Sequence, residues 1–224
     1  MVIKMKKSNI VKKYKITNKD KSKEIIDVLA NHFTDAKCGL DFESPIQLVV
    51  ALILAAQCTD ARVNTIVPVL FEKYPTVYDL AKADVNDIAK IVKPCGFYAN
   101  KSKAISETSK IIVNSFNGEV PKTMDELTTL KGIGRKSANI ILQECFDNTV
   151  GIAVDTHVTR LSRKIGFSNS NTPEKIEQDL MKKFDKKYWS VINHVLVLHG
   201  RAFCIARRPN CDDCPIKDLC PKND

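Results

Sequence analysis

Residues 130–136 read Leu-Lys-Gly-Ile-Gly-Arg-Lys and join two segments whose apolar residues have helical spacing. The two glycines allow a tight turn that leaves backbone N–H groups pointing outward at the start of the second helix. Free amides at the positive end of a helix dipole form an anion site. An ordinary helix connection would also use Gly, but the neighbouring Lys131, Arg135 and Lys136 favour phosphate binding.

Lys136 lies in the first turn of the second helix, which we expect at about residues 135–146. The helix dipole disfavours a cation there by a few tenths to about 1 kcal/mol, and most helices carry Asp or Glu instead. That cost favours the neutral amine, which is the form that a nucleophile needs. A flexible surface lysine in contact with phosphate fits the same position equally well, so both interpretations stand.

Asp155 precedes another helix in the sequence Val-Asp-Thr-His at residues 154–157. Asp is a frequent N-cap residue, which is the structural interpretation. A carboxylate near an amine could also accept its proton and stabilise cationic intermediates, and the two roles are compatible. His157 is equally suited to a structural hydrogen bond and to a DNA contact.

The apolar spacing is helical almost throughout, with no alternating strand pattern, so the predicted fold class is all-α. The longest apolar run, Leu48 to Ala56, has nine residues, whereas a membrane-spanning helix needs about 20. We expect helices at about 22–33, 46–57, 60–73, 76–81, 84–91, 98–115, 123–129 and 135–146, then one from Asp155 to Gly166, one from Thr172-Pro173, and one at 188–203.

The net charge of +9 belongs mostly to an N-terminal arm. Residues 1–23 contain nine Lys and one Asp, a net charge of +8, and the other 201 residues carry only +1. Such an arm is typical of a solvated segment with weak, nonspecific affinity for phosphates. It lacks the apolar core of a secretory signal, so we expect a cytoplasmic or nucleoid location.

Eight cysteines fall into two groups. Four are scattered in helical or apolar contexts, where we expect small buried hydrophobes: Cys38, Cys58, Cys95 and Cys145. The others follow a C-x6-C-x2-C-x5-C pattern: Cys204, Cys211, Cys214 and Cys220. Disulfides and a structural zinc ion are the alternatives. Only the middle pair has zinc-knuckle spacing, and staggered thiolate ligation favours a [4Fe–4S] cluster.

Together these features resemble the helix-hairpin-helix DNA glycosylases, and among them the endonuclease III family. The resemblance covers about residues 24–220. It is carried by Ala56-Gln57-Cys58-Thr59-Asp60, Gly96-Phe97-Tyr98, Leu130 to Lys136, Val154-Asp155-Thr156-His157, Leu198-His199-Gly200-Arg201 and the four clustered cysteines.

The resemblance implies two helical domains with a DNA-binding cleft between them. A six-helix barrel with the helix-hairpin-helix would span residues 38–148. An iron–sulfur cluster domain would combine 24–37 with 149–224, and residues 1–23 would form the basic arm. Double-stranded DNA with a damaged base or an abasic site would lie across the cleft, with the damaged nucleotide flipped out of the stack.

The resemblance also implies site residues. Lys136 corresponds to the catalytic amine and Asp155 to its carboxylate, and one [4Fe–4S] cluster would be held by Cys204, Cys211, Cys214 and Cys220. DNA contacts are expected from Gln57, Phe97, Lys131, Gly132, Ile133, Gly134, Arg135 and His157. Gln57 matches the residue that fills the gap left by the flipped base. Phe97 and Cys95 stand where the family usually has aliphatic residues.

The implied activity is that of a bifunctional glycosylase and abasic-site lyase. It removes oxidised pyrimidines and then cleaves the strand 3′ to the abasic site by β-elimination through a lysine Schiff base. We expect a monomer. One alternative is a monofunctional adenine glycosylase, but those enzymes lack Lys at position 136 and carry an extra C-terminal domain. Another is a non-catalytic DNA-binding or electron-transfer module, which has no need for Lys136 and Asp155 together.

Overall fold

A computed structural model describes residues 14–222, and every regular element in this range is a helix, which confirms the all-α prediction. None of these helices is long and apolar enough to cross a membrane. Eleven are α-helices, and η1 and η2 are 3₁₀ turns that the spacing did not predict. In chain order they are α1 (Lys19–His32), α2 (Pro45–Ala55), α3 (Asp60–Lys73), α4 (Val77–Lys82), α5 (Val85–Val92), η1 (Lys93–Cys95), α6 (Tyr98–Phe116), α7 (Met124–Leu127), α8 (Arg135–Phe146), α9 (Thr156–Ile165), α10 (Pro173–Lys183), η2 (Lys186–Tyr188) and α11 (Trp189–Ala202).

Helix α1 begins three residues before the expected start, because the side chain of Asn18 accepts a hydrogen bond from the Lys21 amide at 2.9 Å and caps it. Part of the expected arm is therefore helical. Residues 14–17 run along the end of α9, where the Thr17 amide donates to the Gly166 carbonyl at 2.9 Å. The first 13 residues of the arm lie outside the described range.

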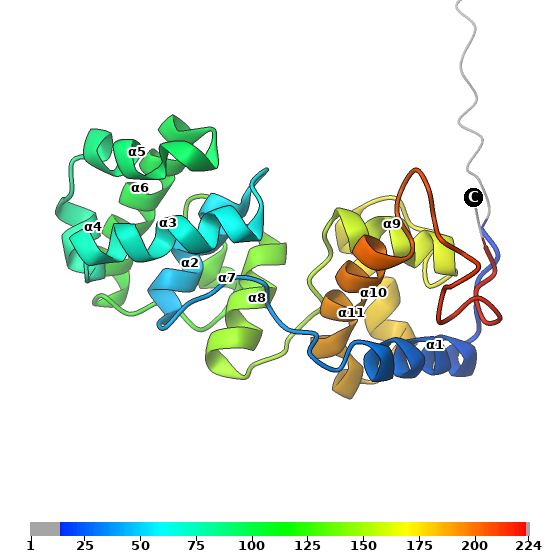
Figure 1. Cartoon of the computed structure of the whole chain (residues 1–224). Helices are drawn as coiled ribbons and strands as arrows, with labels where there is room; N and C mark the ends of the chain where they lie inside the picture. Colours follow the sequence, from blue (N-terminus) through cyan, green and yellow to red (C-terminus); the bar gives the residue numbers. More distant parts are fainter. Residues whose placement is uncertain (1–13, 223–224) are drawn as a thin grey trace, which may run out of the picture.

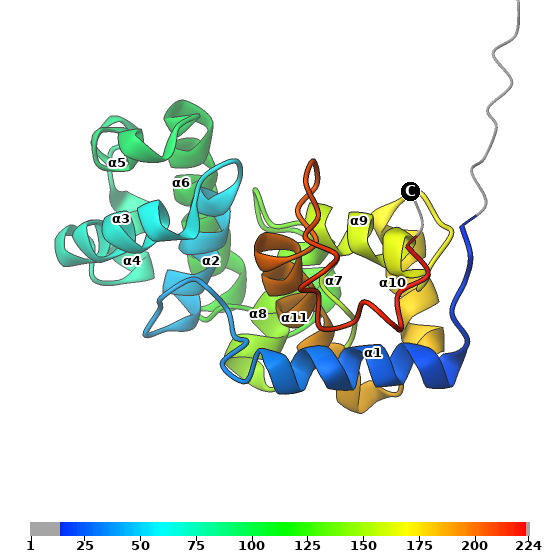
Figure 2. The same cartoon turned by 45° about the vertical axis from the view of Figure 1, so that its right-hand side comes forward.

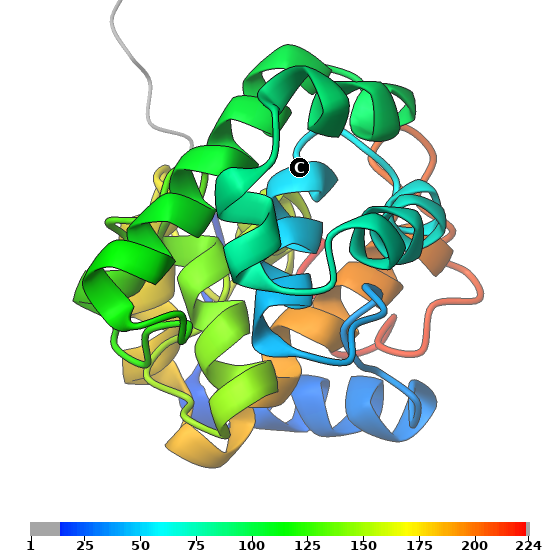
Figure 3. The ribbon, with the colours of Figure 1, turned by 90° about the vertical axis from the view of Figure 1, so that its left-hand side faces the viewer.

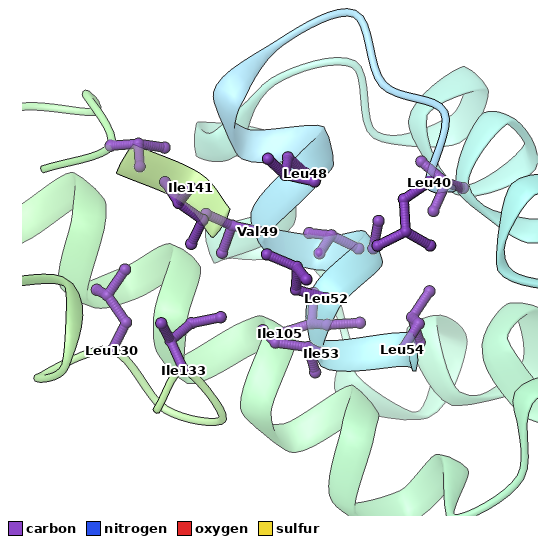
Figure 4. Packing of buried hydrophobic residues seen from close by; sticks show 14 of the residues in the cluster. Leu40, Leu48, Val49, Leu52, Ile53, Leu54, Ile105, Leu130, Ile133 and Ile141 are labelled. Carbon is purple, nitrogen blue, oxygen red and sulfur yellow. The ribbon is translucent and has the colours of Figure 1, made fainter. Parts of the chain in front are cut away.

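The first hydrophobic core forms around α2, which is apolar on nearly every side and lies among α3 to α8 (Figures 1 and 3). Leu48, Leu52 and Leu54 of α2 are 5% exposed or less and pack near Ile105 of α6 and Ile141 of α8 (Figure 4). Each fully buried Leu or Ile contributes roughly 1.5–3 kcal/mol. This central position is the reason that α2 carries no polar face.

The second core joins the two ends of the chain. Helix α1 packs against α11 and lies beside the C-terminal segments (Figures 1 and 2). Leu29 of α1 shares this core with Leu161 of α9 and Leu196 of α11. The rings of Phe167 and Phe184 meet edge to face at 5.1 Å between their centroids. The N-terminal helix is therefore part of the same packing unit as α9 to α11.

The two cores meet along the segment before α9. Ile152 and Val154 point into the second core, whereas Ala153 belongs to the first, so the segment alternates between them. The side-chain amide of Asn193 on α11 donates to the Ala153 carbonyl at 2.8 Å. The segment that joins α8 to α9 therefore runs along this seam between the two cores. The domain boundaries expected at 37/38 and 148/149 stay predictions.

Candidate functional site

The turn before α8 has the geometry of an open helix N-terminus. Gly132 has a φ of 83°, and a Cβ there would lie 3.3 Å from Cγ1 of Ile53. Gly134 is the N-cap of α8 and offers no side chain to its first amides. Ile133 is only 4% exposed and anchors the turn in the first core. The Ile133 side chain therefore faces the core and is not available to a ligand. The backbone of the two glycines and the Lys131 side chain form the exposed surface of the turn.

Lys136 and Asp155 line the same cavity of about 150 Å³ at the seam. Lys136 is the second residue of α8, and Asp155 is the N-cap of α9, where one carboxylate oxygen accepts from the Val158 amide at 2.8 Å. Both residues are half-buried. The cap confirms the structural role of Asp155, and it holds the carboxylate on the cavity that Lys136 also lines.

Six further polar or thiol side chains line this cavity: Lys37, Cys38, Asp60, Asn193, His194 and Arg201. Oδ2 of Asp60 on α3 lies 3.0 Å from a guanidinium nitrogen of Arg201 on α11, so this ion pair bridges the two cores. Nε2 of His194 lies 3.1 Å from Oε1 of Glu144, and this hydrogen bond holds the pKa of Glu144 below its ordinary value.

The spacing of the histidines gave no sign that His194 reaches this cavity. Asp60 belongs to the Gln57 motif, but nothing in the motif indicates its contact with Arg201, which lies 141 residues away in the chain. A local sequence pattern carries no signal for either contact, because both depend on how the two cores meet. Burial raises the pKa of the Cys38 thiol, so this cysteine borders the cavity as a neutral group.

Gln57 and Phe97 are both exposed and both in the left-handed backbone region, with φ values of 54° and 47°. Phe97 is 64% exposed, the largest fraction among the exposed large hydrophobic side chains. A non-glycine residue held in this region costs of order 1–3 kcal/mol. The fold therefore holds two strained turns that present an amide and an aromatic ring to solvent. The DNA contacts of Gln57 and Phe97 stay predictions.

Arg135 and His157 are less available than the sequence suggested. The guanidinium of Arg135 pairs with Glu177 of α10, which is buried and also accepts from Nδ2 of Asn139 at 2.8 Å. Half of the Arg135 side chain still faces water. His157 is half-buried with its Nδ1 inside, and a Cβ on Gly200 would lie 2.7 Å from that atom.

All four clustered cysteines line a second cavity, of about 260 Å³. A single tetrahedral zinc ion would hold its four sulfurs about 3.8 Å apart, since Zn–S bonds are about 2.3 Å. Within residues 14–222, no three His, Cys, Asp or Glu side chains are placed to share one ion. The donor set is four thiols around a volume, which fits an iron–sulfur cluster.

The surroundings of these thiols fit the negative charge of such a cluster. A guanidinium nitrogen of Arg160 lies 3.8 Å from Sγ of Cys204, and the Lys222 amide donates to Sγ of Cys220 at 3.4 Å. Burial raises the pKa of Cys214 and Cys220, so their ionisation is coupled to binding of a cation.

Of the scattered cysteines, Cys95 is buried as expected. The other three are half-buried at the edge of the first core: Cys38, Cys58 and Cys145. The eight cysteines are all free thiols. The disulfide alternative is therefore not the one that the structure adopts.

Comparisons with known proteins agree with this geometry. Residues 50–186 match the family model "HhH-GPD superfamily base excision DNA repair protein", and residues 204–220 match "Iron-sulfur binding domain of endonuclease III". Endonuclease III of Synechocystis sp. is 43% identical over 92% of this chain and 94% of its own.

Two solved structures are similar over most of the chain. A non-covalent endonuclease III–DNA complex and a trapped covalent endonuclease III–DNA intermediate each have a TM-score of 0.86 and 37% identity, over 92% of this chain and 96% of theirs. The chain therefore belongs to the endonuclease III family of HhH-GPD superfamily base excision DNA repair proteins, and is a DNA glycosylase and abasic-site lyase with an iron–sulfur site.

Proposed function

We propose that the enzyme removes oxidised pyrimidines from duplex DNA and cleaves the strand through a Schiff base on Lys136. The observation that carries this proposal is that Lys136 and Asp155 line one cavity, although they come from different cores. The amine stands in the uncapped first turn of α8, beside a turn suited to phosphate. The cavity thus combines a nucleophile, a carboxylate and a place for the DNA backbone.

In the proposed reaction, Nζ of Lys136 attacks C1′ of the flipped nucleoside, and the damaged base leaves with the electrons of the glycosidic bond. Asp155 takes a proton from the amine and stabilises positive charge at the sugar. The sugar ring opens as the C1′–N bond becomes a Schiff base. Loss of a C2′ proton then expels the 3′ phosphate, which is the β-elimination step.

The exposed turns would open the duplex. Gln57 would fill the gap left by the flipped nucleotide, and Phe97 would wedge into the base stack beside it. The backbone of Gly132 and Gly134, together with Lys131, would hold the phosphates. The ion pair with Glu177 leaves the Arg135 guanidinium partly free for DNA, and the inward ring of His157 makes it the weakest candidate contact.

We further propose that Cys204, Cys211, Cys214 and Cys220 hold one [4Fe–4S] cluster. When bound, the cluster ties residues 204–220 into one loop on the second core. A brown protein with broad visible absorbance and about four iron atoms per chain is expected. A colourless protein with one zinc ion would contradict this assignment. We place the monomeric enzyme in the cytoplasm with the chromosomal DNA that it repairs.

Borohydride trapping tests the reaction. Wild-type protein incubated with duplex that contains thymine glycol or an abasic site, together with borohydride, should form a covalent protein–DNA complex. Lys136→Ala should form none. Lys131→Ala, an exposed lysine of the same turn, should bind more weakly with a smaller salt dependence, but should still trap once the protein is in excess over its dissociation constant. Trapping by Lys136→Ala at the wild-type level would overturn the proposal.

A further inference from the structure

Lys101 on α6 is a buried lysine that the proposed reaction does not use. The residue is 5% exposed, and its Nζ donates to the backbone carbonyls of Leu54 and Cys95, each at 2.8 Å. An ammonium group has three donors and no acceptor, and its burial is costly unless hydrogen bonds replace water. These two carbonyls therefore take the place of water around the Lys101 ammonium within the first core. Because one ammonium group bonds to both, a shift of one carbonyl would also disturb the bond to the other.

Both carbonyls come from helix ends. Leu54 is the next-to-last residue of α2, and Cys95 is the last residue of η1. The last carbonyls of a helix have no partner within it, and they form the negative end of its dipole. Lys101 thus satisfies two helix ends from different parts of the chain with one cation. The consequence is that the end of α2 and the end of η1 are tied at a fixed separation.

The strained turns begin immediately after these two ends. Gln57 follows Leu54 by three residues, and Phe97 follows Cys95 by two. The backbone amide of Lys101 also donates to the Phe97 carbonyl at 3.1 Å. Lys101 therefore bonds directly to the turn that carries Phe97. It also bonds to the end of α2, which leads into the turn that carries Gln57.

A second contact joins the same two turns. The thiol of Cys58, which follows Gln57, lies close enough to the thiol of Cys95 to affect its ionisation. Burial, and then this neighbouring thiol, raise the pKa of Cys95 to about 11. The two turns are thus adjacent, and Lys101 is the charged member of the contact between them.

We propose that Lys101 is a positioning residue for base extrusion, which sets the separation of the Gln57 and Phe97 turns so that both side chains enter the duplex at one nucleotide pair. The inference rests on the proposed function, which gives these side chains their role in DNA. Lys101 does not line the cavity that holds Lys136. Its loss should therefore impair opening of the duplex more than bond formation at the sugar.

The test compares Lys101→Met with Lys103→Met, an exposed lysine on the same helix. One substrate is duplex with thymine glycol next to 2-aminopurine, whose fluorescence reports unstacking. The other is a single-stranded abasic oligonucleotide trapped with borohydride, in which no base has to be extruded. For Lys101→Met we expect unstacking and duplex excision to fall about 100-fold, because a shift of about 1 Å in a positioning group has this effect. Trapping of the single-stranded abasic oligonucleotide should stay within about twofold of wild type.

Equal losses on both substrates, or no loss on duplex, would overturn the inference. If Lys101→Met does not fold, Lys101→Arg keeps donors for both carbonyls, and the same selective loss on duplex is expected from its different reach. Failure of wild-type protein to trap abasic DNA would instead overturn the proposed function. The fluorescence comparison of the Lys101 and Lys103 variants would still decide the role of Lys101.

Discussion

Asp155 has two separable roles, because the same carboxylate caps α9 and lines the cavity with Lys136. Asp155→Asn keeps an oxygen for the Val158 amide and removes the charge, so the free energy of unfolding should change by less than about 0.5 kcal/mol. Asp155→Ala removes both and should cost about 1 kcal/mol. For a chain of this size, that cost lowers Tm by about 2–4 °C.

Turnover should respond differently from stability. A positioned proton acceptor contributes about 10²- to 10⁴-fold, so both Asp155 variants should lose at least about 100-fold in single-turnover excision. Their affinity for uncleaved DNA should stay unchanged. Asp84 is a matched control, since it caps α5 by accepting from the Asn86 amide at 2.7 Å, far along the chain from the cavity. Asp84→Ala should lower Tm by a similar amount and keep full turnover.

Thermal melting and single-turnover excision on one duplex decide between the roles. An Asp155→Asn protein with near-normal turnover would remove the carboxylate from the mechanism. An Asn variant as unstable as the Ala variant would contradict the capping role.

Three further predictions concern the turn and the buried charges. Gly132→Ala should cost about 1–2 kcal/mol because of its positive φ, and it should weaken DNA binding. Gly134→Ala has open space and an ordinary φ, so it should lose only the N-cap preference of Gly over Ala, about 0.5 kcal/mol; equal Tm values would contradict this. Arg135→Met leaves the buried carboxylate of Glu177 without its cation and should lower the free energy of unfolding by about 3 kcal/mol. This value is the low end for a broken buried ion pair, because half of the Arg135 side chain faces water. An unchanged denaturant midpoint would count against this prediction. Glu144 has a folded pKa below its ordinary value of 4.5, so its stabilising effect is present above about pH 4.5 and is lost as the pH falls through the folded pKa. Glu144→Gln should flatten the dependence of Tm on pH below 4.5, and an unaltered profile would refute the assignment.

Local patterns predicted the helices well, because caps and stops are encoded within a few residues. Asp155 begins α9 and Gly166, with a φ of 86°, ends it at the expected place. The central position of α2 also follows from its apolar composition. The length and the caps of a helix depend on a short segment of sequence, whereas the helices that it packs against do not.

Contacts between distant segments could not be predicted in this way. Arg135 was expected to face phosphate, but its partner Glu177 is 42 residues away on another core. Lys101 shows no local feature that distinguishes it from an exposed lysine, since the carbonyls that it binds depend on how α2 meets η1. Charge pattern alone cannot separate a buried cation from a surface one.

The central claim is that the amine of Lys136 is the atom that bonds to the DNA sugar. The most direct measurement is peptide mapping by mass spectrometry of the borohydride-reduced protein–DNA complex after nuclease and protease digestion. A sugar adduct on the peptide that contains Lys136, with fragment ions that assign it to this residue, is the expected result. An adduct confined to Lys131 or to any other lysine would contradict the account.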